Sequence, residues 1–223
     1  MKQIYLPSVG STNAWMQEIL MHQTWDEGTL VYTDYQTNGR GQLTNTWESE
    51  AGKNILMSMY FAPLWLPIKD QFVLSQAVAL GVVDFLRQYA DGFQIKWPND
   101  IYWQHQKIAG ILIEYTGRFV VVGIGINVNS NPTVDKYKTT KLDNYSEIPM
   151  NELLNRLMKN VDKWRRSDFR AVRARWTELA ACLNRPVKYQ GEMAELIGIN
   201  ENGALVLRKG TRYLLVYGDE ISL

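Results

Sequence analysis

The sequence is poor in the residues that build disulfides and metal centres. Its 223 residues include one cysteine, Cys182, and two histidines, His22 and His105. One cysteine cannot form an internal disulfide, and these three residues are too few for a Cys/His zinc set. We therefore expect a protein of a reducing compartment with no fixed metal site of its own.

The sequence also lacks an excess of charge of either sign. Its 24 basic and 23 acidic residues leave a formal net charge of +1. Such a balance gives no overall field for attracting nucleic acid or an anionic membrane, so we expect neither as a partner. An anionic ligand would have to be held by a local site.

Long apolar runs are absent too. No run approaches the roughly 18 residues of a membrane-spanning helix, and the first residues, MKQIYLPSVGSTN, lack the apolar centre of a signal peptide. The sequence therefore predicts a cytoplasmic protein. Its 46% hydrophobic content is enough to fill the core of one domain with a small appendage.

Hydrophobic periodicity predicts an alternation of strands and helices. Strands are expected at 3–7, 30–35, 54–62, 93–103, 107–115 and 118–129, with a tight turn at 104–106. Helices are expected at 11–23, at 71–90 and within 149–183. Near Asn184 the pattern changes to short β-rich runs with glycine turns, typical of a small barrel. We therefore predict two domains, 1–183 and 184–223.

A glycine-rich segment, TNGRGQLTNTW at 37–47, is the first candidate for a ligand site. Gly39 and Gly41 permit positive φ and close approach to the backbone, so the N–H groups around Arg40 could form a nest for phosphate or carboxylate. The segment is neither a Walker A loop nor a dinucleotide-binding fingerprint. An ordinary surface loop is the alternative, and for such a segment alone it is the commoner one.

The segment KWPNDIYWQHQKIAGILIE, at 96–114, places polar residues among apolar strands. Pro98 should display Asn99 and Asp100 at a strand mouth, where an amide and a carboxylate can meet a ligand. Lys107 alternates with apolar residues along its strand, so a cation is expected on an apolar face. Such a lysine either reaches solvent at the strand end or meets an anion, and Asp100 is either a turn carboxylate or a functional one.

The segment VVVGIGINVN, at 120–129, has glycines inside an apolar strand. Gly123 and Gly125 leave room for another group to approach the backbone, and Asn127 offers an amide at the strand end. A glycine kink that lets the sheet coil is an equal alternative. At the first helix, Ser11 or Thr12 is expected to act as the N-cap.

Several segments together resemble the motifs of the biotin protein ligases. They are STN, YQTNGRG…W, KWPNDI, KIAGILIE and GIGINVN, in this order, and the resemblance continues into the C-terminal segment. It implies an α+β fold similar to the catalytic domain of class II aminoacyl-tRNA synthetases. In that fold a mixed, largely antiparallel sheet is backed by helices, and a small SH3-like β-barrel follows at the C-terminus.

The resemblance also implies an activity. Ligases of this family convert biotin and ATP, with Mg²⁺, to biotinyl-5'-AMP and pyrophosphate, and then transfer biotin to one lysine of a biotin carboxyl carrier domain. The implied partner is therefore a biotin-dependent carboxylase, and the implied assembly is a monomer or homodimer. Both steps develop negative charge on phosphate oxygens, which a fixed cation and aimed N–H groups stabilise.

Roles for individual residues follow from the matching motif positions. The implied catalytic residues are Lys107, at the biotin carboxylate and α-phosphate, Asp100, which orients or deprotonates the incoming lysine, and Arg40. The implied biotin-binding residues are Ser11, Thr12, Asn13, Gln36, Gly39, Arg40, Gly41, Lys107 and Gly110. The implied ATP-binding residues are Arg40, Gln42, Trp47, Asn99, Lys107 and Asn127, with Trp47 covering the adenine.

One segment departs from the family pattern. The loop usually reads GRGRxGRxW, but here it is GRGQLTNTW, with Gln42, Thr44 and Asn45 in place of Arg, Gly and Arg. Glutamine can hydrogen-bond but carries no charge, so we expect retention of the adenylate to depend more on Lys107, Arg40 and Mg²⁺. The loop is also expected to act as a flap that closes over biotin and adenylate and excludes water.

Three other functions share parts of this pattern. A lipoate–protein ligase has the same implied catalytic fold, but KWPND and the C-terminal barrel favour biotin. A biotin-responsive DNA-binding regulator is not expected, because the chain begins at once with the catalytic motifs and its charge is balanced. Lys107 and Asp100 argue against an inactive vitamin-binding module.

Overall fold

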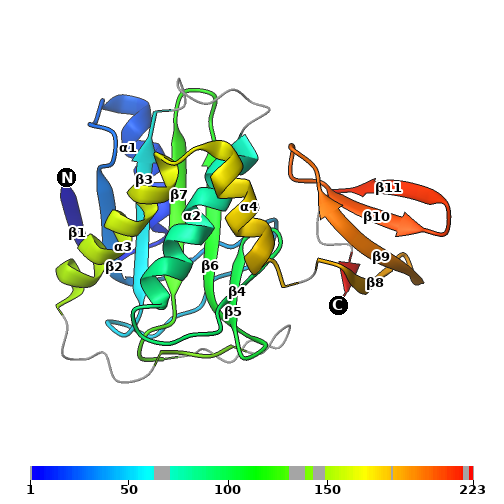
Figure 1. Ribbon diagram of the computed structural model, residues 1–223. Helices are drawn as coiled ribbons and strands as arrows, with labels where there is room; N and C mark the ends of the chain where they lie inside the picture. Colours follow the sequence, from blue (N-terminus) through cyan, green and yellow to red (C-terminus); the bar gives the residue numbers. More distant parts are fainter. Residues whose placement is uncertain are drawn as a thin grey trace.

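The computed structural model describes residues 2–62, 71–130, 139–142, 149–181, 183–217 and 221–222. A seven-stranded sheet with helices on both faces forms the main body, and a smaller sheet follows it (Figure 1). The single cysteine, Cys182, lies outside the described residues. None of the helices in the described ranges has both the length and the apolar character needed to cross a membrane.

The central sheet is mixed but mostly antiparallel. Its strand order is β1-β2-β3-β7-β6-β5-β4, and every neighbouring pair is antiparallel except β1 with β2. The central strands β3 and β7 are buried along nearly their whole length, as expected for strands covered on both faces. The strands are β1 (Gln3–Val9), β2 (Leu30–Gln36), β3 (Ile55–Phe61), β4 (Gln94–Lys96), β5 (Asp100–Trp103), β6 (Gln106–Tyr115) and β7 (Val120–Ile126).

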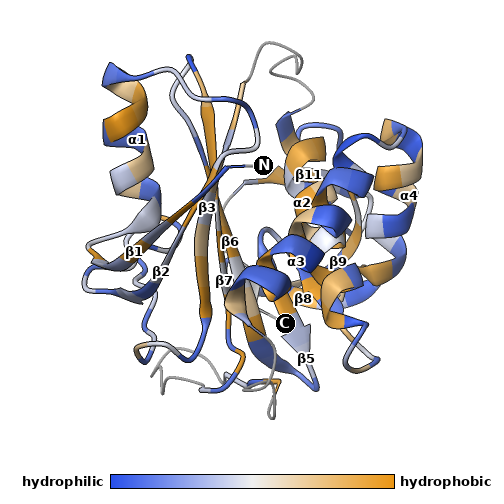
Figure 2. Cartoon of the chain, turned by 90° about the vertical axis from the view of Figure 1, so that its left-hand side faces the viewer, coloured by the Kyte–Doolittle hydropathy of each residue, from blue (hydrophilic) through white to orange (hydrophobic). Residues whose placement is uncertain are grey.

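Helices cover both faces of this sheet. α1 (Thr12–His22) lies on one face, whereas α2 (Gln71–Leu86), α3 (Met150–Arg165) and α4 (Phe169–Leu179) lie on the other (Figure 2). Most of α2 is buried, including the apolar residues Val73, Leu74, Ala77, Val78, Val82, Phe85 and Leu86. A Cβ at Gly81 would lie 2.6 Å from the Cα of Val161, so α2 and α3 approach each other closely at this glycine.

Two groups of buried apolar side chains hold these layers together. The larger lies between the sheet and the helices α2 to α4, and it extends to the C-terminal strands. The smaller lies under α1 and consists of Met16, Val31, Phe119 and Val121. Full burial of such a side chain stabilises a fold by about 1.5–3 kcal/mol. α1 is thus fixed by a small core of its own, which sets the position of its N-terminus.

The C-terminal strands form a second sheet, as their glycine-punctuated pattern predicted. Its strand order is β11-β10-β9-β8-β12, and all neighbours are antiparallel. It begins beside the predicted boundary at 184, and folding of 184–223 as a separate domain stays a prediction. The strands are β8 (Arg185–Tyr189), β9 (Glu192–Ile199), β10 (Leu205–Lys209), β11 (Arg212–Val216) and β12 (Ile221–Ser222).

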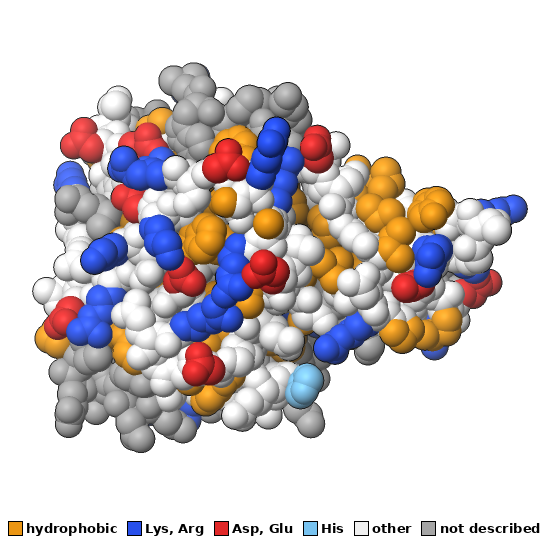
Figure 3. All heavy atoms as spheres, in the orientation of Figure 1, with side chains coloured by type: hydrophobic (Ala, Val, Ile, Leu, Met, Phe, Trp, Pro, Cys, Tyr) orange, Lys and Arg blue, Asp and Glu red, His pale blue; other side chains and the backbone are white. Residues whose placement is uncertain are grey.

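Charged side chains of both signs are interspersed on the face that carries α2, α3 and α4 (Figure 3). This distribution agrees with the formal net charge of +1. Apolar side chains gather over the second sheet, where Met193, Tyr213 and Leu215 are exposed. This face therefore offers no broad single-sign surface for a polyanion.

One predicted strand is divided in the structure. The segment 93–103 forms two short strands, β4 and β5, which pair as an antiparallel hairpin. The turn between them contains Pro98, which has no N–H to donate to a strand ladder, and the Trp97–Pro98 peptide bond is cis. The continuous strand expected from periodicity is therefore wrong at this proline.

Two local predictions are confirmed by backbone geometry. Ser11 caps α1, and its hydroxyl accepts a hydrogen bond from the Ala14 N–H at 3.5 Å. The tight turn between β5 and β6 is formed by Gln104 and His105, whose φ angles are both positive, at 50° and 63°. Paired positive φ angles are typical of a two-residue hairpin turn.

Candidate active site

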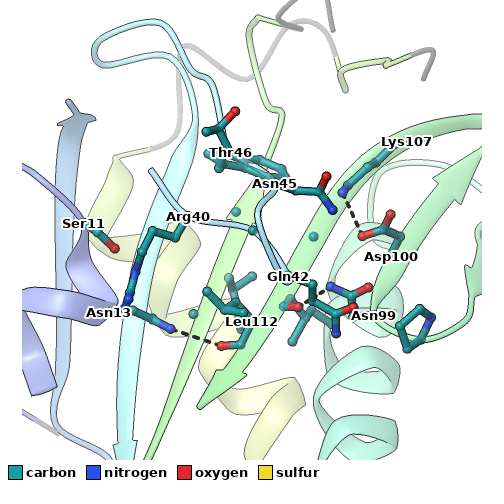
Figure 4. Close-up of a pocket in the computed structure, with 18 of the residues that line it drawn as sticks. Ser11, Asn13, Arg40, Gln42, Asn45, Thr46, Asn99, Asp100, Lys107 and Leu112 are labelled. Atoms are coloured by element: carbon teal, nitrogen blue, oxygen red, sulfur yellow. Dashed lines mark hydrogen bonds and ion pairs between the residues drawn. The ribbon is translucent and has the colours of Figure 1, made fainter. Parts of the chain in front are cut away.

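A cavity of about 260 Å³ lies where α1, the loop after β2, the β4–β5 hairpin and the strands β6 and β7 meet (Figure 4). Every residue of the predicted site except Gly39 and Asn127 lines it. The predicted residues that do so are Ser11, Thr12, Asn13, Gln36, Arg40, Gly41, Gln42, Trp47, Asn99, Asp100, Lys107 and Gly110. Motifs far apart in the sequence therefore converge on one cavity.

The N-terminus of α1 supplies a polar wall at one end of the cavity. The backbone N–H and the hydroxyl of Thr12 both donate to Oε1 of Gln36, at 2.8 and 3.1 Å. Because the amide oxygen of Gln36 accepts both bonds, its amide nitrogen is the end that can meet a ligand oxygen. This wall suits a small polar group that carries a carbonyl acceptor.

A buried serine outside the recognised motifs supports this wall. Ser58 on β3 is fully buried, and its hydroxyl contacts Oγ1 of Thr12 at 2.7 Å and Oδ1 of Asn13. Gly123 on β7 admits the Asn13 amide, because a Cβ at that position would collide with it. Strand periodicity carried no signal for Ser58, since only the packing of α1 on β3 brings it to the site.

Arg40 reaches from the loop to β6. Its Nη2 forms an ion pair with Oε2 of Glu114 at 2.9 Å, and the same oxygen accepts from Nδ2 of Asn13 at 2.8 Å. The Arg40 and Glu114 side chains are 38% and 27% exposed, and ion pairs this solvated contribute about 0–1 kcal/mol. The contact therefore orients the arginine more than it stabilises the fold. Glu114 belongs to the KIAGILIE motif but was not a predicted site residue.

The glycine loop forms a small hairpin. Neither Gly39 nor Gly41 has a positive φ, and the left-handed residue is Leu43, with φ 54°. The N–H of Gly41 donates to the carbonyl of Asn45 at 2.8 Å. Of the two alternatives for this segment, the anion nest around Arg40 therefore gains no support from the backbone, because the Gly41 N–H is used within the loop.

Trp47 closes this loop and lies over two glycines. The backbone N–H of Trp47 donates to the carbonyl of Gly39 at 3.0 Å, which places Gly39 at the base of the loop. A Cβ at Gly110 or Gly125 would come within 2.8 or 2.5 Å of the indole ring. The group that these glycines admit is therefore the aromatic side chain of Trp47, which lines the cavity.

Lys107 and Asp100 form a shielded ion pair at the cavity (Figure 4). Nζ of Lys107 lies 2.8 Å from Oδ1 of Asp100, and the two side chains are 11% and 19% exposed. The same nitrogen lies 5.5 Å from the centroid of the Trp47 ring. Of the two alternatives for this lysine, the structure shows the one in which it meets an anion. Reduced exposure strengthens its interaction with any charge that enters the cavity.

A β-bulge turns Lys107 towards the cavity. The register of β5 and β6 shifts by one residue, so that Ile108 and Ala109 both pack into the main core. Strict alternation predicted that Lys107 and Ala109 share one face of the strand. Because of the bulge, they lie on different faces. Lys107 lies beside Gly110, where a Cβ would be 3.3 Å from Nζ.

Asn99 fixes the turn that carries Asp100. Its side-chain Nδ2 donates to the backbone carbonyl of Ile111 at 2.7 Å, and its backbone carbonyl accepts from the Ile111 N–H at 2.9 Å. Both contacts attach the turn to β6, the strand of Lys107. This attachment keeps the carboxylate and the ammonium group in register.

Asn127 lies outside the cavity in which it was predicted to contact the adenylate. Its side chain is 1% exposed, and its Nδ2 donates to the carbonyl of Thr140 at 3.1 Å. It does not line the cavity, and its amide instead ties the end of β7 to the segment 139–142. This arrangement gives no support to a direct contact between Asn127 and a ligand in the cavity.

Lys96 and Tyr102 are further lining residues that were not predicted. Nζ of Lys96 lies 3.3 Å from the hydroxyl and 5.0 Å from the ring centroid of Tyr102. In a single continuous strand, Lys96 and Tyr102 would be six residues apart and could not contact each other. The β4–β5 hairpin brings them together, which periodicity could not reveal.

The cavity is suited to an anionic ligand. Among the described residues, the charged ones that line it are Arg40, Lys96, Asp100 and Lys107, so cations outnumber carboxylates in this part of the lining. Carboxylate and phosphate groups form their strongest hydrogen bonds with such cations. Within the described ranges, no three His, Cys, Asp or Glu side chains are grouped so as to hold a metal ion.

Fold and cavity together describe an α+β domain with a cavity suited to a small polar, anionic ligand, and comparison with known proteins identifies its family. The chain belongs to the Biotin/lipoate A/B protein ligase family, which it matches over residues 5–131. The resemblance to biotin protein ligases seen in the motifs is thereby confirmed.

Individual relatives resemble the chain over most of its length. The bifunctional ligase/repressor BirA of Escherichia coli (strain K12) is 30% identical over 98% of this chain and 73% of its own length. A biotin--[acetyl-CoA-carboxylase] ligase of Mycobacterium tuberculosis is 31% identical over 71% of this chain and 64% of its own. Among solved structures, the biotin protein ligase from Aquifex aeolicus in complex with biotin and ATP has a TM-score of 0.81, at 27% identity, over 99% of this chain and 97% of that one.

Proposed function

We propose that this protein is a biotin–protein ligase that forms biotinyl-5'-AMP from biotin and ATP and then passes biotin to one lysine of a carrier domain. One observation carries the proposal. A single cavity joins a polar wall at Thr12 and Gln36 to the shielded cation of Lys107, with Trp47 between glycine-lined strands. The names of the relatives and the biotin and ATP bound in the similar solved structure support it.

The polar wall at α1 is the place for the ureido ring of biotin. That ring has a carbonyl acceptor and two N–H donors. The Gln36 amide nitrogen and the hydroxyls of Ser11 and Thr12 offer matching partners. Lipoate has no ureido group, so this wall favours biotin within a family whose name covers both.

The cation of Lys107 serves the first reaction step. A carboxylate oxygen of biotin attacks the α-phosphorus of ATP, and the bond from that phosphorus to its bridging oxygen breaks to release pyrophosphate. Negative charge concentrates where the carboxylate and phosphate meet. A shielded ammonium group stabilises that charge far better than one in water. Arg40, held at the same cavity by Glu114, supplies a second cation.

Asp100 serves the second step. The lysine amine of the carrier domain attacks the acyl carbon of biotinyl-5'-AMP, and the acyl–oxygen bond breaks to release AMP. The amine loses a proton in this step. Asp100 is the carboxylate that lines the cavity, and it is fixed beside Lys107 by the Asn99 turn. We assign it the orientation or deprotonation of the incoming amine.

The proposal extends to partners and architecture. Mg²⁺ enters on the ATP phosphates, which offer the oxygen ligands that this ion prefers. The partner is the biotin carboxyl carrier domain of a carboxylase, met in the cytoplasm by a monomer or homodimer. Residues 1–183 form a catalytic domain of the class II synthetase type, and 184–223 form an SH3-like domain.

The decisive experiment is a transfer assay. The protein is incubated with ATP, Mg²⁺, a carrier domain and either biotin or lipoate, and the carrier is weighed by mass spectrometry. We expect the mass of one biotin on the carrier, with pyrophosphate released, and no lipoate adduct. A lipoate adduct without a biotin adduct would reverse the substrate assignment. Pyrophosphate release in neither reaction would refute the ligase assignment.

The uncharged residues Gln42, Thr44 and Asn45 of the loop predict weak retention of the adenylate. Gln42 lines the cavity, and Gln42→Arg adds a cation beside the phosphate. One added charge-assisted hydrogen bond should slow dissociation of biotinyl-5'-AMP by about 10- to 150-fold, from a typical contribution of about 1.5–3 kcal/mol. Leu43→Arg is the matched control, because Leu43 is 84% exposed on the same loop and does not line the cavity. Equal dissociation rates in the two variants would contradict the prediction.

A further inference from the structure

Trp97 stands between the cavity and the second sheet. Its side chain is 8% exposed and lines the cavity. Its indole N–H donates to the carbonyl of Gly203 at 2.9 Å, in the turn between β9 and β10. A residue of the cavity wall is therefore hydrogen-bonded to the part of the chain that follows the predicted domain boundary.

The turn that receives this hydrogen bond is rigidly built. Oδ1 of Asn200 accepts from the N–H groups of Asn202 and Ala204, at 3.0 and 2.9 Å. Gly203 has φ 86°, a left-handed conformation that favours glycine. A Cβ at this position would lie 2.5 Å from the Phe72 ring, so the turn is also seated against α2. The carbonyl that Trp97 meets is thus held from two sides.

A second contact joins the β4–β5 hairpin, which Trp97 adjoins, to the segment that follows α4. β4 is the edge strand of the central sheet. Ile95 on β4 forms a parallel bridge with Ala180, and its carbonyl accepts from the Ala181 N–H at 2.9 Å. In Figure 1 the second sheet lies beyond this edge, next to α4. The segment that leads into the second sheet therefore holds β4 at Ile95, and the turn within that sheet holds Trp97.

We propose that the 200–204 turn of the second sheet positions the catalytic turn through Trp97, and that biotin transfer depends on this support. Asn99 and Asp100 lie two and three residues after Trp97, beyond Pro98, so a shift of the indole moves the carboxylate relative to Lys107. Misplacement of a reacting group by about 1 Å can cost about 100-fold in rate. Trp97 is thus a positioning residue, and this role rests on the proposed function.

The test is Trp97→Phe, which removes the N–H and keeps an aromatic ring. Transfer of biotin from preformed biotinyl-5'-AMP to the carrier domain should slow by about tenfold or more. KM for biotin should stay unchanged, because the ureido wall is at the opposite end, on α1 and β2. Trp103→Phe is the matched control: its indole N–H also donates to a backbone carbonyl at 2.9 Å, that of Asp91, away from the cavity lining.

A second variant addresses the turn itself. Asn200→Ala loosens the 200–204 turn without altering any residue of the cavity, and it should slow transfer in the same way. The double variant should be no slower than Trp97→Phe alone, because both changes break one chain of contacts. Thermal unfolding of all variants separates a changed rate from a lost fold.

The outcomes distinguish this inference from the proposed function. A wild-type protein that forms no biotinyl-5'-AMP refutes the ligase assignment itself. An active wild type, with Trp97→Phe and Asn200→Ala transferring biotin as fast as Trp103→Phe, overturns the positioning role. A rise in KM for biotin with an unchanged transfer rate overturns it as well, because it would place the effect at the ureido wall.

Discussion

Replacing Lys107 with methionine should slow formation of biotinyl-5'-AMP by about 100- to 1000-fold, the usual cost of removing a group that stabilises developing negative charge. Methionine keeps an unbranched stem, so packing beside Gly110 and Trp47 is retained. The variant loses the ammonium group 2.8 Å from Asp100, and a carboxylate then remains in the cavity to repel phosphate. Pyrophosphate release at saturating biotin and ATP measures the rate.

Lys2→Met provides the control for this prediction. Nζ of Lys2 lies 5.4 Å from the centroid of the Trp25 ring, a lysine–indole contact like that of Lys107 but outside the cavity. It should leave the rate within about twofold of wild type, since surface changes away from a site have small effects. A folded Lys107→Met protein that still reacts within about tenfold of wild type would remove the electrostatic role assigned here.

Much of the fold was predictable because its signals are local. Apolar spacing placed α2 correctly, the hydroxyl before the first helix marked the cap at Ser11, and glycine turns marked the C-terminal strands. The motif residues at the cavity were predictable from their resemblance to a family, since periodicity alone left each of them ambiguous. Local signals therefore sufficed for most elements, the strand divided at Pro98 excepted, but not for the site.

The remainder depends on contacts between distant segments. The bulge at Ile108 redirects Lys107, and it exists only in the pairing of β6 with β5. Ser58 and Glu114 became site residues only when α1 and the loop packed against β3 and β6. No pattern within one segment encodes such pairings, because a strand face is defined only once its partner and register are fixed.

The same dependence on close packing makes Gly125 a sensitive position. Gly125→Ala should raise KM for ATP by about 5- to 150-fold, equivalent to the roughly 1–3 kcal/mol of one base–aromatic stacking contact. The added Cβ would lie 2.5 Å from the Trp47 indole, so the ring must leave the strand on which it lies and would lose the adenine-covering position that the family resemblance implies for it. Initial rates of pyrophosphate release at varied ATP measure the effect.

Gly198→Ala is the matched control, because Gly198 is also a strand glycine and a Cβ there would meet nothing within 4 Å. Its KM for ATP should equal that of the wild type. Combining Gly125→Ala with Trp47→Ala should give a KM no higher than Trp47→Ala alone, since the collision disappears with the indole. An additive increase in the double variant would show that Gly125 acts on ATP by some route other than Trp47, and the adenine-covering role of this tryptophan would then have no support.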